Sequence, residues 1–240
     1  MADSGTSIDL GKGLQFTVAG PMKTDLLALQ KEHDAFQEKA RKEAGKAALA
    51  AFTDTSVANL SSIVLVAETK KKRILLTGDA RGDKILEGLE KAQLLKPGGK
   101  MHLDILKVPH HGSDRNMATI FFERVTADHY VFSGDGEHGN PECETLQMLL
   151  DARGDSEFTV HLTYPIDEID AARKAEWEKQ QAKEKKKQMN KPGALVREDW
   201  SPKKHSLASF FATNKAIAKK VAIVAEDESH VIDLHDKLGY

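Results

Sequence analysis

Two short stretches carry side chains that could bind a metal ion, and each follows an apolar run. Residues 103–108 are apolar enough for a buried strand, and Pro109 ends it because proline has no N–H for a strand ladder. His110 and His111 follow at once. Upstream, residues 74–77 form a second apolar run, which ends in Gly78 and the carboxylate of Asp79. Imidazoles and a carboxylate suit zinc or manganese, so these stretches predict part of a metal site.

The spacing of the two stretches agrees with this chemistry. About thirty residues separate them, which is the natural length of a helix plus a strand between successive strand ends. A carboxylate can bridge two metal ions that share a hydroxide nucleophile. Neighbouring side chains of an extended chain point to opposite sides, so we expect only one of His110 and His111 to bind a metal ion directly.

Three segments together resemble the metallo-β-lactamase-fold hydrolases. They are residues 59–64 (Asn-Leu-Ser-Ser-Ile-Val), 75–79 (Leu-Leu-Thr-Gly-Asp) and 107–113 (Lys-Val-Pro-His-His-Gly-Ser). From about residue 14 to residue 150 the chain resembles the C-terminal half of that fold, in the branch that includes the hydrolase domain of bacterial DNA-uptake channel proteins. The resemblance implies that Asp79 is a bridging metal ligand, that His111 binds the metal, and that His110 is a catalytic imidazole that faces the substrate or transfers a proton.

The chain departs from the family pattern at two places. The family's other ligands come from a His-x-His-x-Asp-His motif, and none of the ten histidines here has that spacing. Relatives often carry Gly-His-Pro in a later loop, where this chain has Gly-Asn-Pro at residues 139–141 and a further candidate ligand in His138. We therefore expect a chain that begins partway through the fold and holds zinc or manganese only weakly.

Strand and helix patterns alternate along the chain, which predicts an α/β fold. The resemblance refines this to the C-terminal half of a metallo-β-lactamase-type αββα sandwich with a helical C-terminal extension. We expect a partial domain over residues 1–155 and an extension over residues 156–240 with a Lys-rich polar helix. Strands are expected near residues 14–19, 60–68, 73–77, 103–108, 129–133 and 158–164, with a closing pair at 221–224 and 230–234. Residues 23–51 form a long polar helical pattern, and residues 1–13 a frayed terminus.

The amino-acid composition limits which binding partners we expect. The 240 residues have a formal net charge of -2, so bulk electrostatics predict neither a nucleic-acid nor a membrane partner. Cys143 is the only cysteine, which excludes an internal disulfide and a zinc site built from several thiolates. No signal peptide or membrane-spanning apolar run is present, and we expect a cytoplasmic protein.

Three functions remain open from the sequence. The first is part of a metal-dependent hydrolase of a phosphodiester or another ester, such as a small-molecule or nucleotide-like substrate, with little activity until a complementary N-terminal half or a second copy joins it. The second is a non-catalytic remnant or pairing module of the same fold. The third is a nucleic-acid binder that uses residues 183–191, disfavoured because nearby acids balance its lysines.

A half-fold of this kind should expose an apolar sheet face where its other half would pack. The residues expected on that face belong to strands made for a two-layer core: Ile63, Leu65, Ile74 and Leu76.

Overall fold

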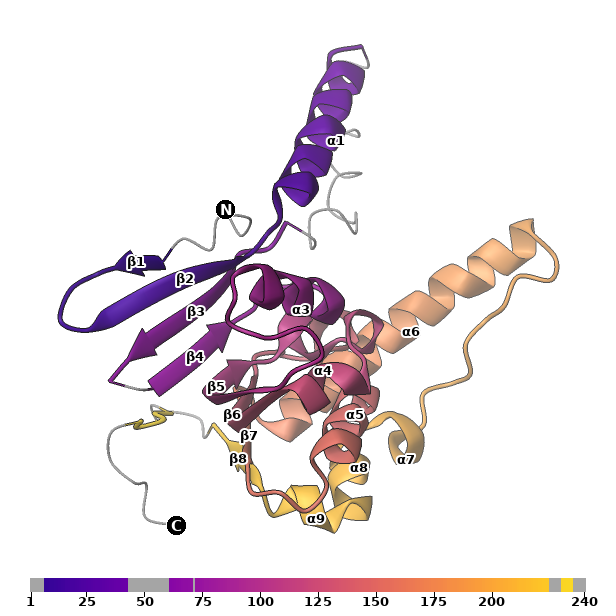
Figure 1. Ribbon diagram of the computed structural model, residues 1–240. Coiled ribbons are helices and arrows are strands. Elements are labelled where there is room, and N and C mark those ends of the chain that lie inside the picture. The colour runs from indigo at the N-terminus through magenta and orange to yellow at the C-terminus, as the bar shows by residue number, and fades with distance from the viewer. Residues whose placement is uncertain (1–6, 43–60, 71, 225–229, 235–240) are drawn as a thin grey trace. The chain divides into compact units, whose positions relative to one another are not determined.

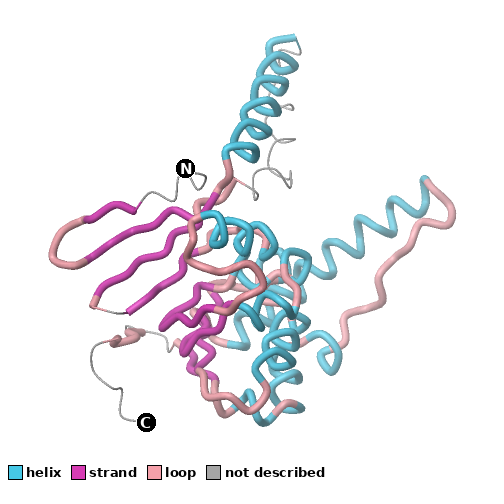
Figure 2. Tube along the Cα trace, in the orientation of Figure 1, coloured by secondary structure: helices cyan, strands magenta, loops and turns pink. Residues whose placement is uncertain are grey.

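The computed structural model describes residues 7–42, 61–70, 72–224 and 230–234, with side chains from 36 to 42 excepted (Figure 1, Figure 2). Part of the expected long helix (43–51), the polar loop after it (53–59) and the first two residues of the segment 59–64 lie outside these ranges. The described residues belong to two compact units. Unit 1 takes residues up to 110 together with 124–126, and unit 2 takes 111–123 and those from 127 onward.

Unit 1 is a sheet with one parallel strand pair. Its elements are β1 (Ser7–Asp9), β2 (Leu14–Gly20), α1 (Lys23–Lys42), β3 (Val64–Thr69), β4 (Lys72–Leu76), α3 (Gly82–Lys91) and β5 (Met101–Lys107). Strands β1 to β4 pair antiparallel in chain order, and β4 pairs with β5 in parallel. The sequence prediction of a frayed terminus over residues 1–13 is wrong at β1, which pairs with β2.

One face of this sheet is the core of unit 1. Thr17, Ala19, Val66 and Leu75 are buried on alternating positions of their strands, as the two-residue period of a strand requires. Helix α3 covers them with its own buried stripe, which consists of Ile85, Leu86 and Leu89. The helix approaches closely because Gly88 has no side chain: a Cβ there would lie 1.7 Å from the carbonyl oxygen of Ala19.

The opposite face of the same strands is apolar but incompletely covered. Val18 pairs with Leu65, and Leu65 pairs with Leu76, so these three side chains share a face. Leu76 is 44% exposed and Ile63, just before β3, is 68% exposed, while Leu65 and Ile74 are half-buried. Of the four residues predicted on an exposed apolar face, Ile63 and Leu76 are thus exposed and Leu65 and Ile74 half-buried, and we call this surface the open face.

Unit 2 contains three parallel strands and most of the helices. Its elements are α4 (Thr119–Arg124) and β6 (Val125–Phe132), which both reach the boundary with unit 1, then α5 (Cys143–Arg153), β7 (Thr159–Leu162), α6 (Ile166–Asn190), α7 (Pro202–His205), α8 (Leu207–Thr213), α9 (Lys215–Ala218) and β8 (Val221–Ile223). Strand β7 pairs in parallel with β6 and with β8. The expected strand at residues 230–234 does not form; a side-chain contact of His230 with His161, instead of a backbone ladder, attaches this segment to the unit.

Helix α6 confirms the predicted polar helix, and the chain that follows it returns along its side (Figure 1). Arg197 of the returning segment binds Glu184 through its guanidinium at 2.7 Å and donates its backbone N–H to the same carboxylate. Nearer the start of α6, Trp177 stacks on His205 with ring centroids 4.2 Å apart. These contacts stabilise a helix that has almost no apolar stripe.

The structure therefore confirms the α/β class with parallel and antiparallel strand pairs. The expected domain boundary near residue 155 stays a prediction. No helix within the described ranges is both long enough and apolar enough to cross a membrane.

Gly88→Ala tests the close packing of α3 on β2. The new methyl group would collide with backbone, which cannot move aside as a flexible side chain can, so we expect a loss of about 1–3 kcal/mol or more in the free energy of unfolding. Urea denaturation measures it. Lys84→Ala, on the same helix but away from that contact, should change stability by no more than about 0.5 kcal/mol. Equal effects of the two substitutions would contradict this packing.

Candidate functional site

The parallel pair β4–β5 brings the two predicted metal-binding stretches together in unit 1. Leu75 lies opposite Leu106, so both strands end at the same edge and the residues after them emerge side by side. The backbone N–H of His110 donates to the carbonyl oxygen of Gly78 at 3.0 Å. This bond joins the ends of the two strands that precede the predicted metal-binding residues.

Two side chains reinforce the junction. Thr77, which is fully buried, donates its hydroxyl to the carbonyl oxygen of Lys107 at 2.8 Å. The Lys107 ammonium donates to the carbonyl oxygen of Gly78 at 3.0 Å. Burial lowers the pKa of Lys107, and the nearby carboxylate of Asp79 opposes that shift. A cationic group thus lies close to the predicted bridging ligand. The sequence analysis did not single out Lys107 for this position. The available signal was a lysine at the end of a buried strand.

Asp79 itself follows a turn that requires glycine. Gly78 has a φ of +52°, and a Cβ at that position would lie 3.0 Å from the Cβ of Ser62. The Ser62 hydroxyl accepts the backbone N–H of Asp79 at 3.2 Å. Ser62, just before β3, therefore holds the backbone of Asp79, which gives the Ser-Ser-Ile-Val stretch a structural role.

The two histidines do not lie on an extended chain, so the premise for assigning them to opposite sides is wrong. Residues 109–112 form a 3-10 turn, and His110 and His111 both have left-handed backbone angles, with φ of 47° and 55°. Non-glycine residues in this region cost of order 1 kcal/mol or more each, and such residues cluster at functional sites. The distinct roles expected for His110 and His111 stay predictions.

His111 belongs to unit 2, where its ring is held in one orientation. Its Nδ1 lies 3.1 Å from the hydroxyl and 3.3 Å from the carbonyl oxygen of Ser133, which directly follows β6. The carbonyl oxygen can only accept, so a proton on Nδ1 satisfies that contact, whereas the hydroxyl can donate to Nδ1 or accept from it. Metal-ligating histidines commonly donate one ring N–H in this way, which fixes the tautomer and orients the other nitrogen.

Glu142 holds the turn that follows His111. Its backbone N–H donates to the carbonyl oxygen of Gly112 at 3.0 Å, and its carboxylate accepts the backbone N–H of Asp114 at 2.7 Å. Gly112 fits tightly, since a Cβ there would lie 2.7 Å from the ring of Phe132. Burial, and after it the hydrogen-bonded side chain of Asp114, raise the pKa of Glu142 to about 7. The sequence analysis does not single out Glu142, because its carboxyl role depends on a residue 28 positions away.

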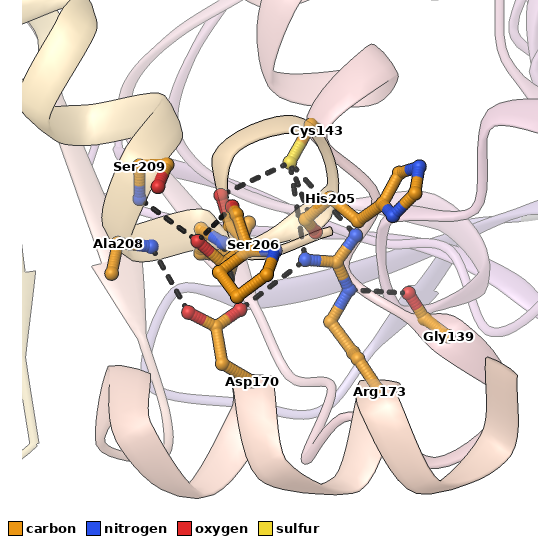
Figure 3. A network of polar contacts seen from close by, with 10 residues as sticks. Gly139, Cys143, Asp170, Arg173, His205, Ser206, Ala208 and Ser209 are labelled. Atoms are coloured by element: carbon orange, nitrogen blue, oxygen red, sulfur yellow. Dashed lines mark hydrogen bonds and ion pairs between the residues drawn. The ribbon is translucent and has the colours of Figure 1, made fainter. Parts of the chain in front are cut away.

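The Gly-rich loop of residues 134–141 is fixed by a buried polar network in unit 2 (Figure 3). Arg173 of α6 is only 7% exposed and donates to the carbonyl oxygen of Gly139 at 3.0 Å. Its guanidinium also contacts the thiol of Cys143 and the carboxylate of Asp170. That carboxylate in turn accepts backbone N–H groups at the start of α8. The network explains the single cysteine as a packed structural group, and burial raises the pKa of its thiol.

His138 lies on η5 (Glu137–Gly139), the outer turn of that loop, with an exposed side chain and a φ of 58°. It stays a predicted candidate ligand.

A complete metal centre is not present in the described ranges. Among those residues, no group of three or more His, Cys, Asp or Glu side chains is arranged to hold a metal ion.

Comparison with protein-family models and solved structures identifies no family for this chain. No protein-family model matches the chain, and no solved structure matches it.

Glu142→Gln tests the buried carboxyl. The folded protein holds this proton up to about pH 7, whereas an unfolded Glu releases it near its ordinary pKa of 4.5, so the stability contributed by the protonated form is lost as pH rises through this window. Glutamine imitates the protonated acid. We expect the difference in free energy of unfolding between the variant and the natural chain to shift in favour of the variant as pH rises from 4.5 to about 7. The shift should be at most about 1.4 kcal/mol per pH unit.

Denaturant unfolding across that pH range measures the effect. Glu123→Gln removes the same charge from an exposed position on α4 and serves as the control. A pH-independent difference between Glu142→Gln and the natural chain would show that Glu142 titrates normally.

Proposed function

We propose that this chain contributes part of the active site of a metal-dependent hydrolase of the metallo-β-lactamase type, acting on a phosphodiester or another ester. The observation that carries the proposal is the hydrogen bond between Gly78 and His110 at the ends of parallel neighbours β4 and β5. It ties the loop that presents Asp79 to the turn that presents the histidine pair. In α/β sheets, ligands bind beyond the carboxyl ends of the strands, where this junction lies.

The local structure supports the same reading in each unit. In unit 1, three hydrogen bonds fix the junction of Thr77, Gly78, Lys107 and His110. In unit 2, Ser133 orients the ring of His111 and Glu142 clamps the following turn. Strained backbone held by so many contacts is more typical of a functional turn than of a simple connection.

The proposal assigns this chain an incomplete ligand set. Asp79 and His111 are the proposed metal ligands, His110 the proposed catalytic imidazole and His138 a further candidate. Zinc and manganese both accept such oxygen and nitrogen ligands, and a catalytic metal ion needs about three protein ligands plus an open position. The remaining ligands would come from a complementary N-terminal half or a second copy, and the chain alone would have little activity.

The open face of unit 1 favours a second candidate, a non-catalytic pairing module of the same fold. Leu65, Ile74 and Leu76 give the sheet a second apolar surface, of the kind that another layer of structure would cover. A module that only pairs would use this surface and bind no metal ion. Metal content distinguishes the two candidates, because the hydrolase reading requires near-stoichiometric zinc or manganese in the completed assembly.

The activity prediction follows from the incomplete ligand set. With zinc or manganese present, the chain alone should hydrolyse an activated aryl phosphodiester negligibly. A polypeptide that carries the His-x-His-x-Asp-His half should restore activity when mixed with it. Asp79→Ala in this chain should then lower the restored rate at least a hundredfold, while the exposed Asp83→Ala should leave it nearly unchanged. Robust turnover by the chain alone that a chelator abolishes would overturn the proposed division of ligands.

The pairing surface has its own test. Leu76→Asp places a charge on the open face at small cost to folding, since Leu76 is already 44% exposed. We expect it to weaken self-association at least tenfold, measured by sedimentation velocity. Leu195→Asp makes the same change at a residue that is 93% exposed in unit 2 and should have little effect. A natural chain that stays monomeric at high concentration would contradict self-association through this face.

A further inference from the structure

The turn that follows the last residues of α6 concentrates positive charge. Residues 185–196 contain four lysines and no aspartate or glutamate, in a chain whose formal net charge is -2. Every residue from 185 to 193 is exposed. We call residues 185–196 the basic tip. The sequence argument against a membrane partner uses the charge of the whole chain, which averages away a local excess of this kind.

Hydrogen bonds close the basic tip into a defined turn. The backbone N–H of Lys191 donates to the carbonyl oxygen of Lys187 at 2.8 Å. The backbone N–H of Ala194 donates to the carbonyl oxygen of Lys191 at 3.1 Å, and the side-chain amide of Gln188 donates to the carbonyl oxygen of Ala194 at 2.9 Å. The lysines are therefore grouped on a folded turn, whereas an unstructured tail would spread them.

The carboxylate next to these lysines in the sequence is neutralised by another residue. Glu184 binds the guanidinium of Arg197 at 2.7 Å and accepts its backbone N–H at 2.8 Å. Lys185 lies 3.9 Å from the carboxylate of Asp199, which is 92% exposed, and an exposed pair at that distance contributes little. The folded turn thus changes the sequence argument that nearby acids balance these lysines.

Two large apolar side chains accompany the lysines. Met189, in the last turn of α6, is 78% exposed, and Leu195, in the returning segment, is 93% exposed. Among the residues that the structure describes, no other large apolar side chain is as exposed as these two. Water solvates such side chains poorly, whereas the boundary between lipid headgroups and acyl chains takes them up.

Nucleic acid is the other polyanion that a cluster of lysines could bind. Proteins that hold single strands add aromatic side chains on which bases stack, and residues 185–196 contain none. Contacts to phosphates would also leave Met189 and Leu195 in water. A bilayer that contains anionic lipids suits both kinds of side chain at once, because its headgroups attract lysines and its acyl region accepts apolar groups.

We propose that the basic tip is a docking site for the surface of an anionic phospholipid bilayer. The four lysines lie against the headgroups, and Met189 and Leu195 enter the boundary beneath them. Each lysine near such a surface strengthens binding about fivefold, and added salt weakens this attraction. The proposal goes beyond the hydrolase function, and it involves none of the residues assigned to that site.

Flotation of the full chain with lipid vesicles tests the docking site, because protein that only self-associates does not float. The natural chain should float with vesicles of phosphatidylcholine and about 30% phosphatidylserine, and should not float with phosphatidylcholine alone. Lys186→Glu combined with Lys187→Glu should lower the partition coefficient at least about tenfold.

A matched control makes the same change of charge outside the basic tip. Lys203→Glu combined with Lys219→Glu reverses two exposed lysines of unit 2 and should lower the partition coefficient by less than about threefold. Circular dichroism shows whether each variant is folded.

The apolar contact has a readout of its own. Leu195→Trp places a fluorescent side chain in the basic tip, and its emission should shift to shorter wavelength when phosphatidylserine vesicles are added. Lys203→Trp places the same probe at an exposed position outside the tip and should show no added shift. The natural chain supplies the background from Trp177 and Trp200.

Three results would each overturn the docking site. The first is equal flotation with neutral and anionic vesicles, or none with either. The second is equal flotation of the folded tip variant and the folded control. The third is binding of an oligonucleotide that depends on Lys186 and Lys187 while no vesicle is bound, which would assign the basic tip to nucleic acid.

Discussion

The parallel pairing of β4 with β5 is the constraint on which the candidate site depends. Most of unit 1 is antiparallel, and antiparallel neighbours send their chain ends to opposite edges of a sheet. Only the β4–β5 pair lets the loop after Leu76 and the turn after Lys107 leave from the same edge. The helix α3 between these strands makes the parallel connection, and Gly88 lets that helix lie directly against β2.

In each unit, hydrogen bonds and close packing fix the residues next to the proposed ligands. Gly78 and Gly112 adopt backbone angles that favour glycine at places where a Cβ would be crowded. Ser62, Ser133 and Glu142 then hold the flanking loops through hydrogen bonds to backbone or ring atoms. A ligand set positioned in this way loses little further entropy when it binds, which is the advantage of preorganisation. The Arg173 network does the same for the loop of His138.

The open face gives the proposed partner a physical reason to bind. A sheet that buries one face under α3 and leaves apolar side chains on the other gains stability from a second layer, at about 25 cal/mol for each Å² of apolar surface covered.

The sequence alone determined the local features of this protein. Apolar runs that end at Gly78 and Pro109 predicted the two strand ends, and the period-two pattern predicted the open face with Leu65 and Leu76, because these signals depend on neighbours along the chain. Tertiary structure decided the rest. Three features depend on contacts between residues far apart in sequence. They are the left-handed turn at His110 and His111, the raised pKa of Glu142 and the contact between the rings of His161 and His230. A pattern of residue types contains no record of such contacts, because the fold alone brings those groups within hydrogen-bonding distance.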